Sequence, residues 1–138
     1  MIKILQTIEN HWLILSTGML FTITILSLYP LENLPSVPGT DKTHHFIAYA
    51  ALVFPTALRK SQRWLLLIIF FILYGGLIEW VQPYVNRRGE WLDMLANTTG
   101  ILLGVTLAAA MNVFYKREAI QEKRYKTVRN FDCVYLYL

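Results

Sequence analysis

The stretch WLLLIIFFILYGGLIEWVQP, residues 64–83, carries the clearest structural signal in this chain. Its first part, residues 64–77, has no charged side chain, and neither do residues 12–28 or residues 100–115. An α-helix needs about 20 largely apolar residues to cross the hydrocarbon core of a bilayer. The three uncharged stretches therefore predict three membrane-spanning helices.

The composition agrees with a membrane location. Hydrophobic residues make up 55% of the 138 residues and charged residues 16%, which is more apolar surface than a soluble core of this size can bury. The net charge of +4 comes from cations that flank the apolar stretches, so nucleic acid is not an expected partner. Because apolar segments continue beyond residue 28, the first of them is not interpreted as a cleaved signal peptide.

A fourth, shorter span is predicted over residues 42–58. Thr40 and Asp41 offer side-chain oxygens that cap a helix N-terminus, and the basic segment beginning at Arg59 closes the helix. We therefore expect an all-α membrane protein. It is a bundle of four transmembrane helices over about residues 12–28, 42–58, 64–82 and 91–115, which form one domain, residues 1–115, followed by a basic cytoplasmic tail, residues 116–138.

The distribution of Lys and Arg orients the predicted bundle. The N-terminus, the loop between the second and third helices, and the tail together hold ten of the 13 Lys and Arg residues. The other three, Lys42, Arg87 and Arg88, lie at the opposite ends of the helices. Cytoplasmic segments of membrane proteins carry the excess of positive charge, so both termini are predicted to be cytoplasmic.

Gly100 and Gly104 form a GxxxG pattern in the fourth predicted helix. Small residues at this spacing allow two helix backbones to approach each other closely. The pattern predicts a tight contact between the fourth helix and one of its neighbours.

Polar residues of three predicted helices lie at the same, non-cytoplasmic level. They are Asp41, Lys42 and His45 at the start of the second helix, Glu79 and Gln82 at the end of the third, and Asp93 and Asn97 at the start of the fourth. Within each helix the first and last of these residues are three or four positions apart, which places them on one face. An ionised side chain at membrane depth costs roughly 2.5 to 3.5 kcal/mol on insertion scales, so these groups should meet.

Two interpretations of these residues remain open. In the structural one, Glu79 and Asp93 form ion pairs with Arg87 or Lys42 that hold the helix ends together. In the functional one, His45 carries a proton with Glu79 or Asp93 as its partner, while Arg87 and Lys42 receive an anionic group such as a phosphate or a carboxylate.

No metal and no cofactor is expected from the sequence. Asp41, His44, His45 and Glu79 are possible ligand types, but neighbouring histidines on a helix point about 100° apart. The chain has no complete G-x-S-x-G, P-loop or HExxH motif. The sequence therefore leaves it open whether the protein is an enzyme.

The polar residues resemble motifs of the VanZ-like family. Asp41-Lys42-x-x-His45-Phe46 is followed by Tyr49, then by Glu79-x-x-Gln82, and then by Arg87, Asp93, Asn97 and Gly100. These blocks lie between residues 41 and 104, nearly half of the chain, in the family's order and at its usual spacing. The resemblance implies a small multispanning protein of the bacterial cytoplasmic membrane. The family is named for a member that lowers susceptibility to the glycopeptide antibiotic teicoplanin.

The resemblance also implies a set of ligand-binding residues. By the family's pattern they are Asp41, Lys42, His45, Glu79, Gln82, Arg87, Asp93 and Asn97. Arg87 is preferred over Arg88 because it lies six residues before the aspartate of the last block. Glu90 and Trp91 stand where the family's pattern has small polar residues, which is a departure that alters what the pocket admits.

Three classes of function follow from these observations. The first is a binding or resistance module for an amphiphilic envelope ligand, either a lipid-linked cell-wall precursor or the lipoglycopeptide antibiotic itself. The second is an intramembrane enzyme acting on a lipid-linked phosphate or glycan, with His45, Glu79 and Asp93 as candidate acid–base residues. The third is a structural subunit whose polar residues fix helix packing. We rank them in that order, with membrane lipids as partners in each and the oligomeric state left open.

Overall fold

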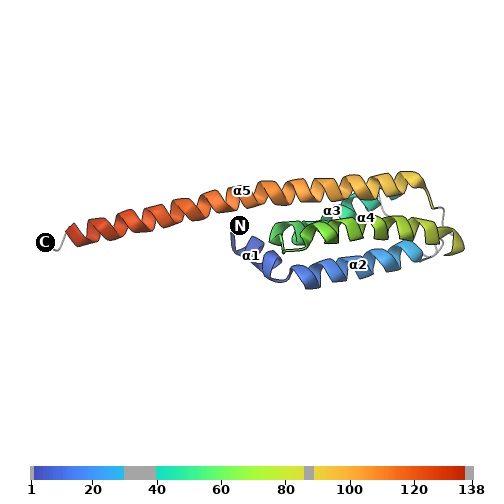
Figure 1. Cartoon of the computed structure of the whole chain (residues 1–138), viewed down its shortest axis with the longest axis horizontal. Helices are drawn as coiled ribbons and strands as arrows, with labels where there is room; N and C mark the ends of the chain where they lie inside the picture. Colours follow the sequence, from blue (N-terminus) through green and yellow to red (C-terminus); the bar gives the residue numbers. More distant parts are fainter. Residues whose placement is uncertain (1, 30–39, 86–88, 136–138) are drawn as a thin grey trace.

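The protein, described here from a computed structural model, consists of helices and short connections over residues 2–29, 40–85 and 89–135 (Figure 1). In chain order the helices are α1 (Ile2–Asn10), α2 (Trp12–Leu28), α3 (Asp41–Arg59), α4 (Trp64–Val81), the 3-10 helix η2 (Gln82–Val85) and α5 (Trp91–Tyr135). Side chains are described as far as Tyr115. These residues contain no strand, and the predicted all-α class is confirmed.

Helix α3 is the most enclosed element of the bundle. It packs along α5 and also contacts α1, α2 and α4. Its N-terminus is capped by the Thr40 side chain, which accepts a hydrogen bond from the backbone N–H of Thr43, and it ends at Lys60 in a left-handed conformation with φ of 46°. Tyr49, Leu52 and Val53 of α3 are completely buried and form the core with residues of α2, α4 and α5.

The contact between α3 and α5 depends on two glycines of α5. A Cβ added at Gly100 would collide with the backbone carbonyl of Phe46, and one added at Gly104 would collide with the carbonyl of Ala50 and with the side chain of Val53. The two backbones therefore touch where a larger residue cannot fit. The close helix contact predicted from the GxxxG pattern is confirmed.

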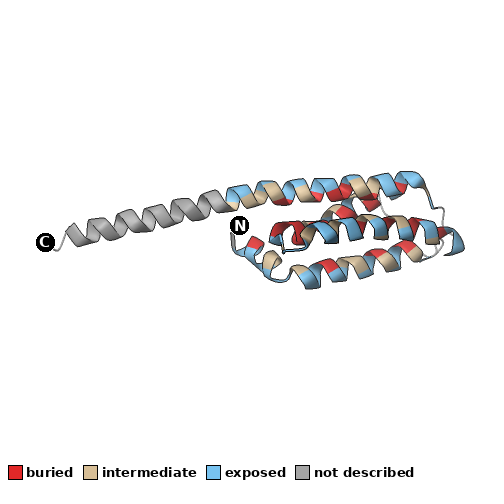
Figure 2. Ribbon diagram, viewed as in Figure 1, coloured by how far each residue is buried: buried red, intermediate tan, exposed pale blue. Residues whose placement is uncertain are grey.

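The outer faces of the helices are apolar. Figure 2 shows buried residues on the faces that helices turn toward one another, with exposed residues on the outside. Large hydrophobic side chains dominate those exposed faces, including Phe21, Leu65, Leu73 and Leu102. A chain whose outer surface is this apolar, and whose helices satisfy their own backbone groups, suits a lipid environment.

By length and apolarity, two segments of the described residues qualify as membrane spans. They are Trp64–Val85, with a mean hydropathy of 2.2, and Trp91–Tyr115, with a mean hydropathy of 1.6. Residues Lys3–Asn10 and Trp12–Leu28 qualify together as a third span although they are bent by 71°. Helix α3 does not qualify, because its first two turns carry the polar side chains of Asp41, Lys42, Thr43, His44 and His45, of which only His45 is buried.

Two helical segments differ from what the sequence analysis expected. Helix α1 was not predicted; it is held by the burial of Leu5 against Ala57 and Leu58 and by an ion pair between Glu9 and Arg59 at 3.2 Å. Short helices are marginal on their own, so a segment of this length depends on such tertiary contacts. Helix α5 continues past residue 115 to Tyr135, since no glycine or proline interrupts the chain after Gly104.

Candidate functional site

The predicted polar residues gather at one end of the bundle, where α3 and α5 begin and α4 ends (Figure 1). We call this the polar end. The residues that meet there from α3, α4 and α5 are named the polar cluster, which comprises Asp41, Lys42, His45, Glu79, Asp93 and Asn97. The sequence spacing within each helix places them on one face, and the packing of α3 against α5 brings the faces together.

His45 is the central residue of the polar cluster. Its imidazole is 6% exposed, and Nδ1 lies 3.0 Å from Asn97 Oδ1 and 3.6 Å from Glu79 Oε1. With the Asn97 amide in this orientation, its carbonyl oxygen can only accept, so Nδ1 is the protonated ring nitrogen and donates a hydrogen bond to that oxygen. Asn97 thereby fixes the plane and the tautomer of the ring.

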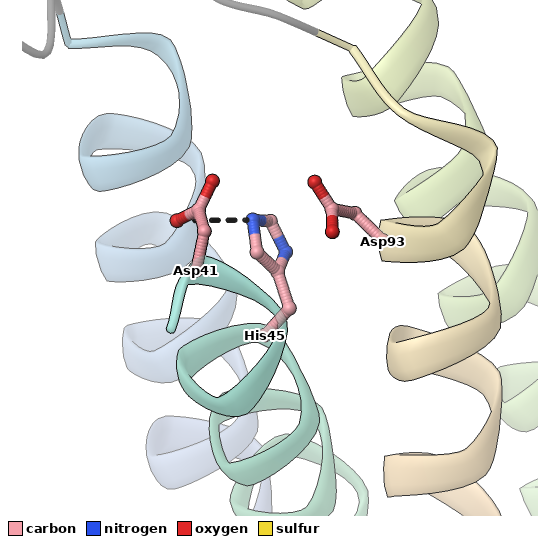
Figure 3. Close-up of side chains that lie close together, drawn as sticks. All are labelled: Asp41, His45 and Asp93. Atoms are coloured by element: carbon pink, nitrogen blue, oxygen red, sulfur yellow. Dashed lines mark ion pairs between the residues drawn. The ribbon is translucent and has the colours of Figure 1, made fainter. Parts of the chain in front are cut away.

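The opposite ring nitrogen of His45 faces a carboxylate. Nε2 lies 4.0 Å from Asp41 Oδ1, and Asp93 approaches the ring from α5 (Figure 3). One ligand-type atom from each of Asp41, His45 and Asp93 lies within 4.8 Å of the other two. His44, which the sequence analysis considered as a metal ligand, is exposed and is not a member of this group.

Lys42 connects the cluster to the chain segment before α5. Its Nζ lies 2.7 Å from Glu90 Oε2 and 3.6 Å from Asp93 Oδ1. The side chains of Lys42 and Glu90 are 42% and 44% exposed, whereas that of Asp93 is 2% exposed. Glu90 was not among the predicted site residues. The sequence marked it only as a departure from the family's pattern, and its position three residues before Asp93 was the available signal.

Several buried polar atoms of this region have no hydrogen-bond partner among the described residues. They are Glu79 Oε1 and Oε2, Asp93 Oδ1, Asn97 Nδ2 and Tyr49 Oη. Buried nitrogen and oxygen atoms are satisfied in the great majority of cases, so a group of exceptions in one place is unusual. Two of these oxygens, Asp93 Oδ1 and Glu79 Oε1, have longer ion-pair contacts of 3.6 Å, with Lys42 and His45 respectively. Tyr49 was not predicted as a site residue, although it lies one helical turn after His45 on the same face.

Gln82 is buried at the polar end, but its side chain forms a hydrogen bond with α2 and, within the described residues, not with the polar cluster. Its Nε2 donates to the backbone carbonyl of Ser27 at 3.4 Å, which joins η2 to α2. Arg87 and Arg88 lie outside the described residues, so the preference for Arg87 stays a prediction. Far from the polar end, a shallow hollow is lined by Leu5, Glu9, Leu58, Asn112 and Tyr115.

The chemistry available to the polar cluster is acid–base and ligand binding. It combines one imidazole with a fixed tautomer, two buried carboxylates, and a partly exposed ammonium group. Carboxylate and imidazole are also the types of ligand that divalent transition metals bind.

Comparison with known families gives a match over most of the chain. The sequence model of a family described as VanZ/LLP1 matches residues 3–114, which include every member of the polar cluster. No curated protein and no solved structure shows a significant match to the chain.

Proposed function

The chain belongs to the VanZ/LLP1 family, and we propose from this premise that it is a four-span protein of the bacterial cytoplasmic membrane. In this proposal α1 with α2, α3, α4 with η2, and α5 each cross the bilayer. Helix α3 has 19 residues and is about 28 Å long, close to the roughly 30 Å of the hydrocarbon core. Its exposed charged residues, Asp41 and Arg59, lie at the two ends of the helix, while His45 and Thr56 between them are buried, so a span of this composition is tolerated.

The charge distribution supports an orientation with both termini in the cytoplasm. Arg59 ends α3, Lys60 and Arg63 follow it, and six further Lys and Arg residues follow residue 115. Both groups lie at the end of the bundle opposite the polar cluster. With the positive charge inside, the polar cluster faces the outer leaflet and the space beyond it.

We propose that the polar cluster binds an amphiphilic envelope ligand, either a lipid-linked cell-wall precursor or a glycopeptide of the teicoplanin type. The observation that carries this proposal is the group of buried polar atoms without a hydrogen-bond partner among the described residues, gathered around His45. Such atoms are costly unless a ligand, an ion or water satisfies them. Lys42 adds a partly exposed cation that suits an anionic head group.

The test is a susceptibility measurement in a glycopeptide-sensitive bacterium that expresses the protein. We expect the wild type to raise the inhibitory concentration of teicoplanin, and Glu79→Gln and His45→Ala to abolish the increase. Glu79→Gln keeps the shape of the side chain, so membrane insertion and expression should remain near the wild-type level. Glu9→Gln is the matched control, because it removes a carboxylate of the ion pair with Arg59 far from the polar end.

If Glu9→Gln abolishes the increase as the site variants do, the proposal fails, because the phenotype would then follow protein stability. Membrane levels of each variant are therefore measured alongside susceptibility.

A second candidate function is supported by the contacts of His45. The ring Nδ1 lies 3.6 Å from the buried carboxylate of Glu79, which is an arrangement that also serves proton transfer. An intramembrane enzyme acting on a lipid-linked phosphate or glycan would use this pair as acid and base. Incubating the purified protein with a lipid-linked pyrophosphate and resolving the products separates turnover from binding alone.

A further inference from the structure

We propose that Asp41, His45 and Asp93 bind a divalent transition-metal ion at the polar end of the bundle. The inference names a ligand of the same polar cluster and, for its biological role, rests on the proposed function. In that role the ion takes part in holding the anionic head group of the envelope ligand.

The first support is the distance between the ligand atoms. His45 Nε2 and Asp41 Oδ1 are 4.0 Å apart, whereas two ligand atoms about 2.0 Å from one tetrahedral zinc ion are about 3.3 Å apart, so a small side-chain movement brings both atoms onto one ion. The Asp93 carboxylate completes a group whose ligand atoms lie within 4.8 Å of one another. Three protein ligands of these types occur in zinc sites that keep an open position.

The second support is the tautomer of His45. Nδ1 donates to Asn97 Oδ1 at 3.0 Å, which leaves the lone pair on Nε2, the nitrogen that faces Asp41. A metal-bound histidine almost always donates its other ring N–H to an oxygen, and this contact sets the orientation of the ring. Asn97 is thus a positioning residue for the proposed site.

The third support is the burial of Asp93. Its side chain is 2% exposed, its Oδ1 has no hydrogen-bond partner among the described residues, and Figure 3 shows the carboxylate directed toward His45. A carboxylate in this position is expensive to bury unless a cation or strong donors compensate its charge. Lys42 Nζ, 3.6 Å from Oδ1, supplies part of that compensation but lies closer to Glu90, at 2.7 Å, and a bound cation next to His45 would supply the rest.

Lys42 is the feature that opposes a cation, and it makes the proposal testable. Its Nζ lies 3.6 Å from Asp93 Oδ1, but its closer contact is the 2.7 Å bond to Glu90 at a partly exposed position. The ammonium group of Lys42 is therefore held chiefly by Glu90. It would still repel a cation bound by Asp93. Replacing Lys42 with the uncharged Met should strengthen metal binding.

The donor set indicates the class of ion. Calcium and magnesium prefer all-oxygen sites, whereas imidazole together with carboxylates suits zinc or manganese. An open coordination position would receive a phosphate or carboxylate oxygen of the ligand.

The experiment titrates the EDTA-treated, full-length protein in lipid nanodiscs with Zn²⁺ alone. We expect one ion per chain, at least tenfold weaker binding for His45→Ala and Asp93→Asn, and tighter binding for Lys42→Met. His44→Ala is the matched control, because it removes the adjacent, exposed imidazole and should leave the affinity unchanged. With Mn²⁺ as the probe, pulsed EPR should show coupling to one imidazole nitrogen that disappears in His45→Ala and persists in His44→Ala.

The proposal is overturned if the wild type binds no stoichiometric ion, if binding survives both His45→Ala and Asp93→Asn, or if His44→Ala abolishes it. Asp93→Asn has nearly the shape of the original side chain, and the melting temperature of each variant shows whether a loss of binding reflects unfolding. Antibiotic susceptibility separates this failure from that of the proposed function. A protein that raises teicoplanin resistance but binds no metal contradicts the metal site alone, whereas metal binding without resistance contradicts the proposed function alone.

Discussion

His45 receives a different neighbour at each ring nitrogen. Nδ1 meets the amide of Asn97 and the carboxylate of Glu79, and Nε2 faces Asp41. Because α5 provides Asn97 and α4 provides Glu79, this imidazole of α3 joins three helices. A substitution here therefore affects both the chemistry of the site and the packing of the helix ends, and a single variant does not separate the two effects.

A double-mutant cycle between His45 and Glu79 separates them. We expect the pair His45→Ala and Glu79→Gln to show a coupling of about 0.5 to 3 kcal/mol in the free energy of unfolding, as residues in contact usually do. The same four proteins are compared for teicoplanin susceptibility. Coupling in stability alone would indicate a structural contact between helices, and coupling in susceptibility would indicate a functional site. Strict additivity in both measurements would show that the two residues do not act together.

The spacing of residues predicted which side chains share a helix face, but not which side chains from other helices meet them. The pairs Asp41 and His45, and Asp93 and Asn97, follow from the helical repeat. The bond between Lys42 and Glu90 does not, since it depends on how the segment before α5 approaches the start of α3. Likewise, nothing in the sequence alone shows that the hydroxyl of a tyrosine one turn after His45 is buried.

At the scale of the elements, the pairing of α3 with α5 organises the bundle. The glycines of α5 let its backbone contact that of α3, and the buried face of α3 fills the space between the other helices. This arrangement explains why α3, whose sequence is less apolar than that of α2 or α4, is also the most enclosed helix. The hydropathy signal is strong for helices that face lipid and weak for a helix that faces protein.

Replacing Gly104 with Leu tests this pairing. The new side chain would collide with the carbonyl of Ala50 and the side chain of Val53, and overpacking of this kind typically costs about 1 to 3 kcal/mol. We expect a lower folded yield in detergent and a lower melting temperature. Gly18→Leu is the control, because a Cβ at Gly18 meets no other atom within 4 Å. An unchanged yield for Gly104→Leu would mean that this face of α5 turns toward lipid.

Helix α1 shows the limit of prediction for short elements. Its residues are mixed in polarity, and its stability comes from contacts with the far ends of α3 and α5, including a bond from Gln6 to the Tyr115 hydroxyl at 3.0 Å. The Gln6–Tyr115 bond joins residues 109 positions apart in the chain, and the ion pair between Glu9 and Arg59 joins residues 50 positions apart. A local sequence pattern contains no information about them, whereas the longer helices are visible from their own apolar residues.

At the scale of the whole molecule, the proposed topology is open to a direct test. Reporter fusions at Gln62 and after Tyr115 should give a cytoplasmic signal, and a fusion at Gly89 should give a non-cytoplasmic one. The reason is that the basic segments follow α3 and residue 115, while the polar cluster lies at the other end. A non-cytoplasmic signal at Gln62 would reverse the orientation and place the polar cluster inside the cell.

The contact at Gly100 sets the dimensions of the site without contributing any chemistry of its own. Gly100 lies three residues after Asn97, and the carbonyl that it touches belongs to Phe46, the residue next to His45. The α3 and α5 backbones can therefore lie this close together at this level only because Gly100 has no side chain. A substitution at Gly100 would therefore change the distance between the His45 imidazole and the Asn97 amide, although Gly100 itself carries no reactive group.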